Sequence, residues 1–405
     1  MNMTCIHRVH NVWLVLALLL AVSSCEIFKN DIPETDNFQQ IYTLNNGDAA
    51  LYPLDVAELP DNEGFLILSA LSDSLANVYP RVHLLKLNAA GNPDWQLEVD
   101  PSYYGPARKI AKINGDLFIF CMKANQQACA LKVNVEAGSI AEFADYDIQI
   151  PLHVSVVNNN EVLITSYNRF GNQTDVLKLN ELLQPQWKQS FPVGTDEDIM
   201  EVNIFNYIRQ QKNYAFFSES VSFGGEELYV VNCFSNYTLS MHYLNASDGK
   251  ISGKINGYQL TGFVTAAQQV SDTALFLSFV HTDKYYVPAI KTPETKTFLN
   301  IDNLTGTYFP EIKAEKAIDA LRYPTNETPE KLVMGINNGS GNPELFVFTA
   351  PEYKLGQIIP VDQHYPSEIR RVIKTADNGL LVLMQIQYAN YLPRISLVKL
   401  PSKVF

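Results

Sequence analysis

A unit of four short apolar segments, separated by turns, recurs along most of this chain. Its clearest copy comprises residues 54–59, 64–68, 82–88 and 95–99. Each segment is rich in Val, Ile, Leu, Phe or Tyr and is flanked by Asn, Gly, Asp or Pro, which is typical of β-strands joined by turns. The best candidate for an amphipathic helix covers only residues 311–320. The pattern therefore predicts an all-β repeat fold.

The repeat count predicts how the fold closes. Further copies cover residues 108–143, 153–191, 202–245, 259–312 and 313–362, and the last runs from Ile369 to Leu400 without a fourth strand. Residues 38–44 resemble residues 187–191 and could supply that strand. Seven four-stranded copies of roughly 45 to 60 residues predict a seven-bladed β-propeller over residues 38–405, with its ring closed by the N-terminal strand. The alternative is a pair of two-sheet sandwich domains.

Two turns carry a family resemblance. The turns at residues 87–95 and 244–249 resemble those of quinoprotein-like, WD40-like and outer-membrane-assembly propellers. This resemblance implies the fold and no particular activity. Quinone-dependent propeller enzymes carry stacked tryptophans, whereas this chain has three Trp, one of them before residue 25. We therefore expect no cofactor.

The N-terminus carries an export pattern. An apolar run over residues 12–22 follows Arg8 and is too short to span a bilayer, as in a secretory signal. It ends in Val22-Ser23-Ser24-Cys25, which resembles a bacterial lipobox. The resemblance implies cleavage before Cys25 and acylation of this cysteine, with palmitate among the acyl chains. Residues 1–24 would then be the signal peptide and residues 25–37 a flexible tether, with an uncleaved anchor as the alternative.

Two further patterns concern the location. Glu26 does not resemble an inner-membrane retention signal, which favours the outer membrane of the cell envelope. Asp73-Ser74-Leu75 and Asp272-Thr273-Ala274 match the short O-glycosylation pattern of Bacteroidetes. The sequence thus resembles a lipoprotein of that bacterial group.

The charge balance restricts the partners. The chain has 30 Lys and Arg against 43 Asp and Glu, a net charge of −13. Nucleic acids and anionic lipid surfaces require clustered positive charge, so neither is an expected partner. Contact with the membrane would depend on the lipid at Cys25. We expect an envelope protein or a glycan as the partner.

Three cysteines lie beyond the proposed lipidation site. Cys121 and Cys129 flank a predicted hairpin, so they either form a cross-strand disulfide or remain two buried thiols. Cys233 has neither a neighbouring base nor an orienting group in the sequence, which favours core packing.

Residues of the first strand in each blade should line the central channel. Aligning these strands places six polar side chains near the channel and three aromatic rings at its entrances; the polar residues are Asp55, Lys109, His153, Asn203, Asp319 and Arg370, and the aromatic ones Tyr52, Tyr104 and Tyr365. Such a ring could bind a polar ligand, and the tyrosines could pack against sugar rings. The alternative is that the channel is polar only because it is wet.

Motifs for catalysis or metal binding are absent from the sequence. It has no His-x-x-x-His, Gly-x-Ser-x-Gly, P-loop or Gly-x-Gly-x-x-Gly pattern. We therefore predict a non-enzymatic binding or scaffolding module without a metal site. The alternative is a hydrolase or lyase acting in the channel, with Asp55, His153 and Asp319 as its acid and base groups.

Overall fold

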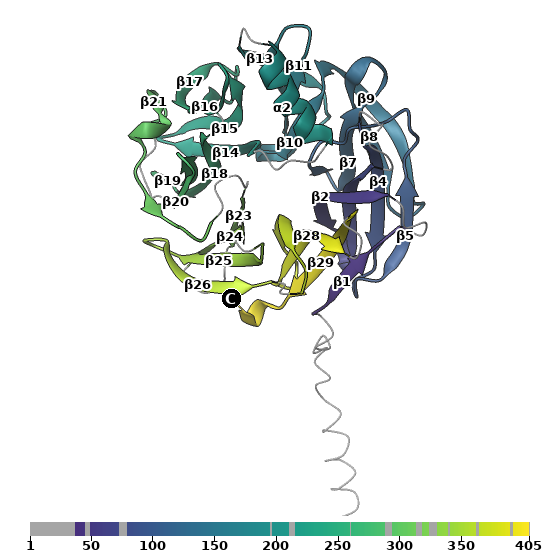
Figure 1. Cartoon of the computed structure of the whole chain (residues 1–405). Helices are drawn as coiled ribbons and strands as arrows, with labels where there is room; N and C mark the ends of the chain where they lie inside the picture. The colour runs from purple at the N-terminus through teal and green to yellow at the C-terminus, as the bar shows by residue number, and fades with distance from the viewer. Residues whose placement is uncertain are drawn as a thin grey trace, which may run out of the picture. The chain divides into compact units, whose positions relative to one another are not determined.

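The computed structural model describes residues 37–44, 49–72, 79–194, 197–209, 215–259, 261–287, 294–312, 318–323, 330–338, 341–361, 364–388 and 392–404. Within these ranges, residues 38–404 form seven sheets that follow one another around a common axis (Figure 1). This arrangement confirms the predicted seven-bladed β-propeller. Cys25, the signal peptide and the tether before Asn37 lie outside the described residues.

Each blade is a mainly antiparallel sheet. Blades 1 to 3 comprise β2 (Ala50–Glu58), β3 (Phe65–Ser72), β4 (Arg81–Leu87) and β5 (Pro93–Glu98); β6 (Ile110–Ile113), β7 (Asp116–Met122), β8 (Gln127–Asn134) and β9 (Ser139–Gln149); and β10 (Pro151–Val156), β11 (Val162–Asn168), β12 (Gln173–Leu179) and β13 (Pro185–Pro192). Blades 4 and 5 comprise β14 (Phe217–Phe223), β15 (Glu226–Ser235), β16 (Thr238–Asn245), β17 (Ile251–Asn256) and β21 (Phe298–Asn300); and β18 (Gly262–Ser271), β19 (Ala274–His281), β20 (Lys284–Val287) and β22 (Thr307–Tyr308). Blades 6 and 7 comprise β23 (Asp319–Tyr323), β24 (Lys331–Asn337), β25 (Pro343–Thr349) and β26 (Lys354–Pro360); and β27 (Ser367–Lys374), β28 (Leu380–Tyr388), β29 (Leu392–Leu400) and β1 (Gln39–Tyr42).

The N-terminal strand closes the ring. In blade 7, β1 pairs antiparallel with β29, with Gln39 opposite Val398 and Tyr42 opposite Ile395. The ends of the propeller thus share one sheet, as predicted. This closure leaves the last blade with the same four strands as its neighbours and covers the edge of β29.

Burial explains why the middle strands are continuous apolar runs. Seven of the eight residues of β3 are buried, because both of its faces pack against neighbouring blades. The outer strand β5 has no fully buried residue and alternates between exposed and half-buried positions. Both patterns follow from the position of a strand within a blade.

Aromatic residues on outer strands join adjacent blades. The indole nitrogens of Trp95 and Trp187 donate to the carbonyls of Val135 and Ala246, at 3.0 and 3.2 Å, in the third-to-fourth-strand turns of the following blades. Trp187 also packs on Gly249, which has a φ of +72° and where a Cβ would lie 2.6 Å from the ring. The repeated turn glycine is thus needed both for its backbone conformation and for the close approach of the ring.

Asparagine shapes the recurring turns. The side-chain oxygen of Asn88 accepts hydrogen bonds from the N–H groups two and four residues later, each at 3.0 Å. Asn180 repeats both bonds at 3.0 and 2.8 Å, and Asn245 repeats the first at 2.9 Å. This Asx geometry explains why the third strands end in Asn.

Blade 4 differs from its prediction. Residues 202–208, expected as its first strand, lie in the α-helix α2 (Glu197–Arg209), and the first strand is β14. Ile204, Tyr207 and Ile208 recur at helical spacing and are buried in one hydrophobic cluster, so packing of a single face explains the helix. The tentative helix over residues 311–320 is also wrong where it is described, because residues 319 and 320 belong to β23.

The cysteine pair is placed as predicted but is not bonded. Cys121 and Cys129 are directly opposite on β7 and β8, and both are fully buried free thiols with sulfur atoms 3.6 Å apart. A disulfide requires about 2.05 Å between the sulfurs. Cys233 is a buried free thiol in a hydrophobic cluster, and its sulfur lies 3.7 Å from Nδ1 of His242, so a base is nearby where the sequence indicated none. Burial raises the pKa of this thiol to about 12 and lowers that of His242 to about 3, which agrees with a packing role.

Candidate functional site

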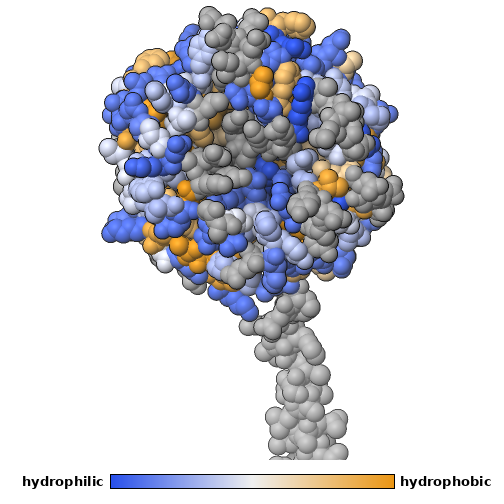
Figure 2. All heavy atoms as spheres, viewed as in Figure 1, coloured by the Kyte–Doolittle hydropathy of each residue, from blue (hydrophilic) through white to orange (hydrophobic). Residues whose placement is uncertain are grey.

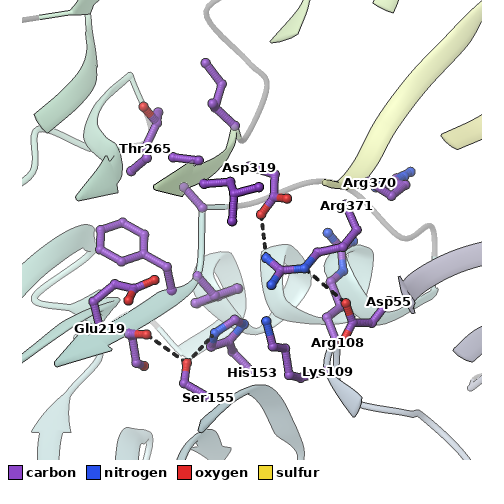
Figure 3. Close-up of a pocket in the computed structure, with 18 of the residues that line it drawn as sticks. Asp55, Arg108, Lys109, His153, Ser155, Glu219, Thr265, Asp319, Arg370 and Arg371 are labelled. Atoms are coloured by element: carbon purple, nitrogen blue, oxygen red, sulfur yellow. Dashed lines mark hydrogen bonds and ion pairs between the residues drawn. The ribbon is translucent and has the colours of Figure 1, made fainter. Parts of the chain in front are cut away.

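The first strands of the blades surround a cavity of about 430 Å³ (Figure 3). On the face seen in Figure 2, hydrophilic residues gather near the centre of the ring. Five of the nine predicted ligand-binding residues line the cavity: Asp55, Lys109, His153, Asp319 and Arg370. They come from five different blades. A cavity of this volume can enclose a small molecule.

The other four predicted residues are not part of the described cavity lining. Asn203 lies on α2, so its expected position on a first strand is wrong. Tyr52 is half-buried against the cluster between blades 1 and 2, and Tyr104 donates to the carbonyl of Lys123 at 2.8 Å. The carbonyl of Tyr365 accepts a hydrogen bond from Ser367, close to the start of β27. These placements do not form an aromatic rim around the cavity.

A β-bulge recurs in the first strands and turns side chains toward the axis. The register shifts between Pro53 and Asp55, between Pro151 and His153, and at the equivalent places in blades 5 and 7. Bulges re-aim side chains and bend the strand. In blade 7 the residue that follows the bulge is Arg371, so the alignment of Arg370 with Asp55 was one position out of register.

Asp55 and Asp319 are held by one arginine. The Arg371 guanidinium lies 3.2 Å from an oxygen of Asp55 and 2.7 Å from an oxygen of Asp319 (Figure 3). The second oxygen of Asp55 accepts the N–H of Ile110 at 2.7 Å, and that of Asp319 accepts the N–H of Val372. The two carboxylates therefore link blade 1 to blade 2 and blade 6 to blade 7. This bonding explains them as structural groups.

His153 is held as a neutral imidazole. Ser155 Oγ donates its proton to the carbonyl of Ser218 at 2.9 Å, so His153 Nε2, 3.0 Å from the same oxygen, must be the donor. Burial lowers the pKa of His153 to about 3, and the cations Lys109, Arg371 and Arg108 lower it as well. At neutral pH the imidazole is uncharged, with its Nδ1 lone pair available as an acceptor.

Lys109 and Glu219 are charged side chains of the cavity lining whose bonding capacity is unused. Both line the cavity, and neither has a hydrogen-bond or ion-pair partner among the described residues. Burial raises the pKa of Glu219 to about 7, an effect that Lys109 and Arg371 oppose and Asp319 supports. Burial lowers the pKa of Lys109. These two side chains are free to meet a ligand.

The helix α2 contributes one wall. Tyr207 donates to the carbonyl of Leu152 at 3.0 Å, and the guanidinium of Arg108 lies 4.5 Å from the centre of its ring. Next to this wall, Arg370 is 3.3 Å from Glu368 and donates to Gln385 at 2.6 Å. The helix thus holds the Arg108 guanidinium at the cavity by a cation–π contact.

Glu219, Arg371 and Tyr207 were missed by sequence reasoning. Glu219 and Tyr207 lie where the first strands of blade 4 were predicted wrongly, because the helix α2 was not foreseen. The alternation Phe217-Ser218-Glu219-Ser220-Val221 is a strand signal that could have located Glu219. Arg371 was missed because the bulge changes which residue faces the axis, and the sequence shows no signal for the bulge.

The described part of the chain shows neither a metal-binding cluster nor a membrane-spanning helix. Its His, Cys, Asp and Glu side chains form no group of three or more that could hold a metal ion. None of its helices has the length and apolar character needed to cross a bilayer.

Comparison with known proteins gives similarity at the level of structure only. No family model and no curated protein matches the sequence. One similar solved structure, described as "Structure of Dos1 propeller", has a TM-score of 0.45 and 11% identity, and covers 86% of this chain and 93% of its own. Another, "Crystal structure of WD40 beta propeller domain of Doa1", has a TM-score of 0.45 and 10% identity, and covers 88% and 96%.

Proposed function

We propose that this protein is a lipid-anchored binding or scaffolding module of a bacterial cell envelope, which takes its ligand into the central cavity. The observation that carries the proposal is the cavity itself. It encloses about 430 Å³ and presents Lys109 and Glu219, neither with a bonding partner among the described residues. Charged groups inside a concave site need bonding partners, which solvent or a ligand with convergent polar groups can supply.

The sequence supports the proposed location. The lipobox-like Cys25 would attach the chain to a membrane, which we assign to the outer membrane of a Bacteroidetes-like host. Residues 1–24 would be removed and residues 25–37 would act as the tether, with a reach of about 45 Å when fully extended. Thr273 of the possible glycosylation pattern lies in an exposed turn between β18 and β19. Because so short a tether would keep the propeller close to the membrane, we expect its partner, either a protein or a glycan, on the same membrane.

The arrangement favours binding over the alternative hydrolase or lyase. Two of the three acid and base candidates, Asp55 and Asp319, are engaged by Arg371 and by backbone N–H groups. The third, His153, has a pKa of about 3, too low for an efficient general base near neutral pH.

A pull-down from intact envelopes tests the proposal. The full-length protein and its Lys109→Gln and Lys112→Gln variants would be cross-linked in the host envelope and recovered. Lys112 is a matched control, because it is an exposed lysine on β6, the strand that directly follows Lys109. We expect a partner with the wild type and with Lys112→Gln that is lost with Lys109→Gln. Equal recovery with all three, or no recovery with any, contradicts the proposal.

A further inference from the structure

We infer that the ligand of the cavity carries a carboxylate, which binds at Lys109 next to Arg108, and that Glu219 takes up a proton as it binds. This inference rests on the proposed role of the cavity as a binding site. It adds the chemical class of the ligand and the coupling of binding to pH.

The first argument is the position of the cations. Arg108 and His153 pair across neighbouring first strands, and Lys109 directly follows Arg108 (Figure 3). The charged groups that act on the His153 ring are Lys109, Arg371 and Arg108, with no carboxylate among them. The described lining of the cavity is net positive, although the whole chain has a net charge of −13: it carries five cationic side chains (Arg108, Lys109, Arg322, Arg370 and Arg371) and three carboxylates (Asp55, Glu219 and Asp319). An anion is the ligand that such a position stabilises.

The second argument is which cations are already neutralised. Arg371 is shared by Asp55 and Asp319, and Arg370 is paired with Glu368. Lys109 has no such pair within the described ranges. Its ammonium group can make a charge-assisted hydrogen bond to a ligand carboxylate without breaking an existing bond.

Glu219 responds to the ligand because of its surroundings. The groups that face it are Lys109 from the segment before β6, Arg371 from β27 and Asp319 from β23. The neighbouring β18 lines the cavity with residues 265–268, none of which titrates. The positive charge of Lys109 favours the ionised form of Glu219, and a bound carboxylate would neutralise it. The carboxylate would also add a negative charge near Glu219. Both changes favour protonation, and protonated Glu219 can donate a hydrogen bond to the ligand.

The cavity volume limits the ligand size. About 430 Å³ is enough for one small organic acid or for one acidic sugar ring. Phe216 and Phe217 also line the cavity, so both a carbon chain and the face of a sugar ring would find apolar contact. A small organic acid and an acidic sugar both supply the carboxylate, and they differ in the rest of the molecule.

Isothermal titration calorimetry of the full-length protein with glucuronate, succinate and glucose tests the inference. We expect glucuronate or succinate to bind and glucose, which has no carboxylate, not to bind. Binding should be about tenfold weaker at pH 8 than at pH 6, because Glu219 with a pKa of about 7 must gain a proton. Lys109→Gln should weaken binding about tenfold or more, and Lys112→Gln should not.

The Glu219→Gln variant separates proton uptake from simple charge attraction. Glutamine keeps a hydrogen-bond donor but cannot titrate, so binding should persist and lose its dependence on pH between 6 and 8. Equal binding of glucose and glucuronate, or no binding of either acid by the folded protein, overturns the carboxylate class. An unchanged pH dependence in Glu219→Gln overturns the role of Glu219. If these tests fail while envelope capture still depends on Lys109, the proposed function stands with another class of ligand.

Discussion

Replacing Glu219 with Gln should change how the stability of the propeller depends on pH. Burial raises the pKa of Glu219 from 4.5 to about 7 in the folded protein. Its contribution to folding is therefore greatest below pH 4.5 and falls as pH rises through 7, because the unfolded chain releases this proton more readily. Glutamine has no proton to release in this pH range, so the variant should not show this loss of stability.

The expected size follows from the two pKa values. A shift of roughly 2.5 units corresponds to about 3 kcal/mol once the group is ionised in both states. Between pH 5.5 and 8.5 the wild type should lose about 2 kcal/mol in free energy of unfolding relative to Glu219→Gln. Comparing the two proteins cancels the pH effects of all other groups.

Urea unfolding followed by tryptophan fluorescence measures this difference. Trp95 and Trp187 both lie at contacts between blades, so their emission reports on loss of the ring. Glu63→Gln is the matched control, since Glu63 is exposed next to a 3-10 turn, and it should follow the wild type at every pH. If the wild type and Glu219→Gln lose stability in parallel, the raised pKa of Glu219 is refuted.

Three further changes test other parts of the structure. Asp55→Ala removes the acceptor of the Ile110 N–H and one of the two carboxylates paired with Arg371, so urea unfolding should show a loss of about 2 kcal/mol; a loss below about 1 kcal/mol would contradict the structural role of Asp55. Gly249→Ala places a Cβ 2.6 Å from the Trp187 ring at a φ of +72°, so it should lower the free energy of unfolding by about 1 kcal/mol or more and shift the Trp emission; unchanged emission would count against the contact. Cys25→Ala should move the protein from the membrane fraction to the soluble fraction, and retention in the membrane would rule out the lipid anchor.

The fold could be predicted from the sequence because the buried middle strand of each blade is a run of apolar residues that recurs along the chain. The middle strand β3 is buried on both faces and reads as a continuous apolar run, whichever blades surround it. The closing strand β1 was recognisable because Phe38 plays the part of Trp95 and Trp187, packing on the turn glycine Gly91.

The site was less predictable because it depends on register. A single bulge decides that Arg371, and not Arg370, binds Asp55 and Asp319. The apolar residues of α2 also fit a strand, so the first strand of blade 4 was predicted too early in the chain and Glu219 was missed. Both errors concern which side chain faces the axis, which the apolar pattern alone does not specify.

Native mass spectrometry of the protein released gently from its own envelopes tests the central claim most directly. We predict that the wild type and Lys112→Gln carry an added mass that Lys109→Gln lacks. The claim that the cavity is a binding site is contradicted if the wild type has only the mass of the processed chain and its lipid, or if the added mass persists in Lys109→Gln.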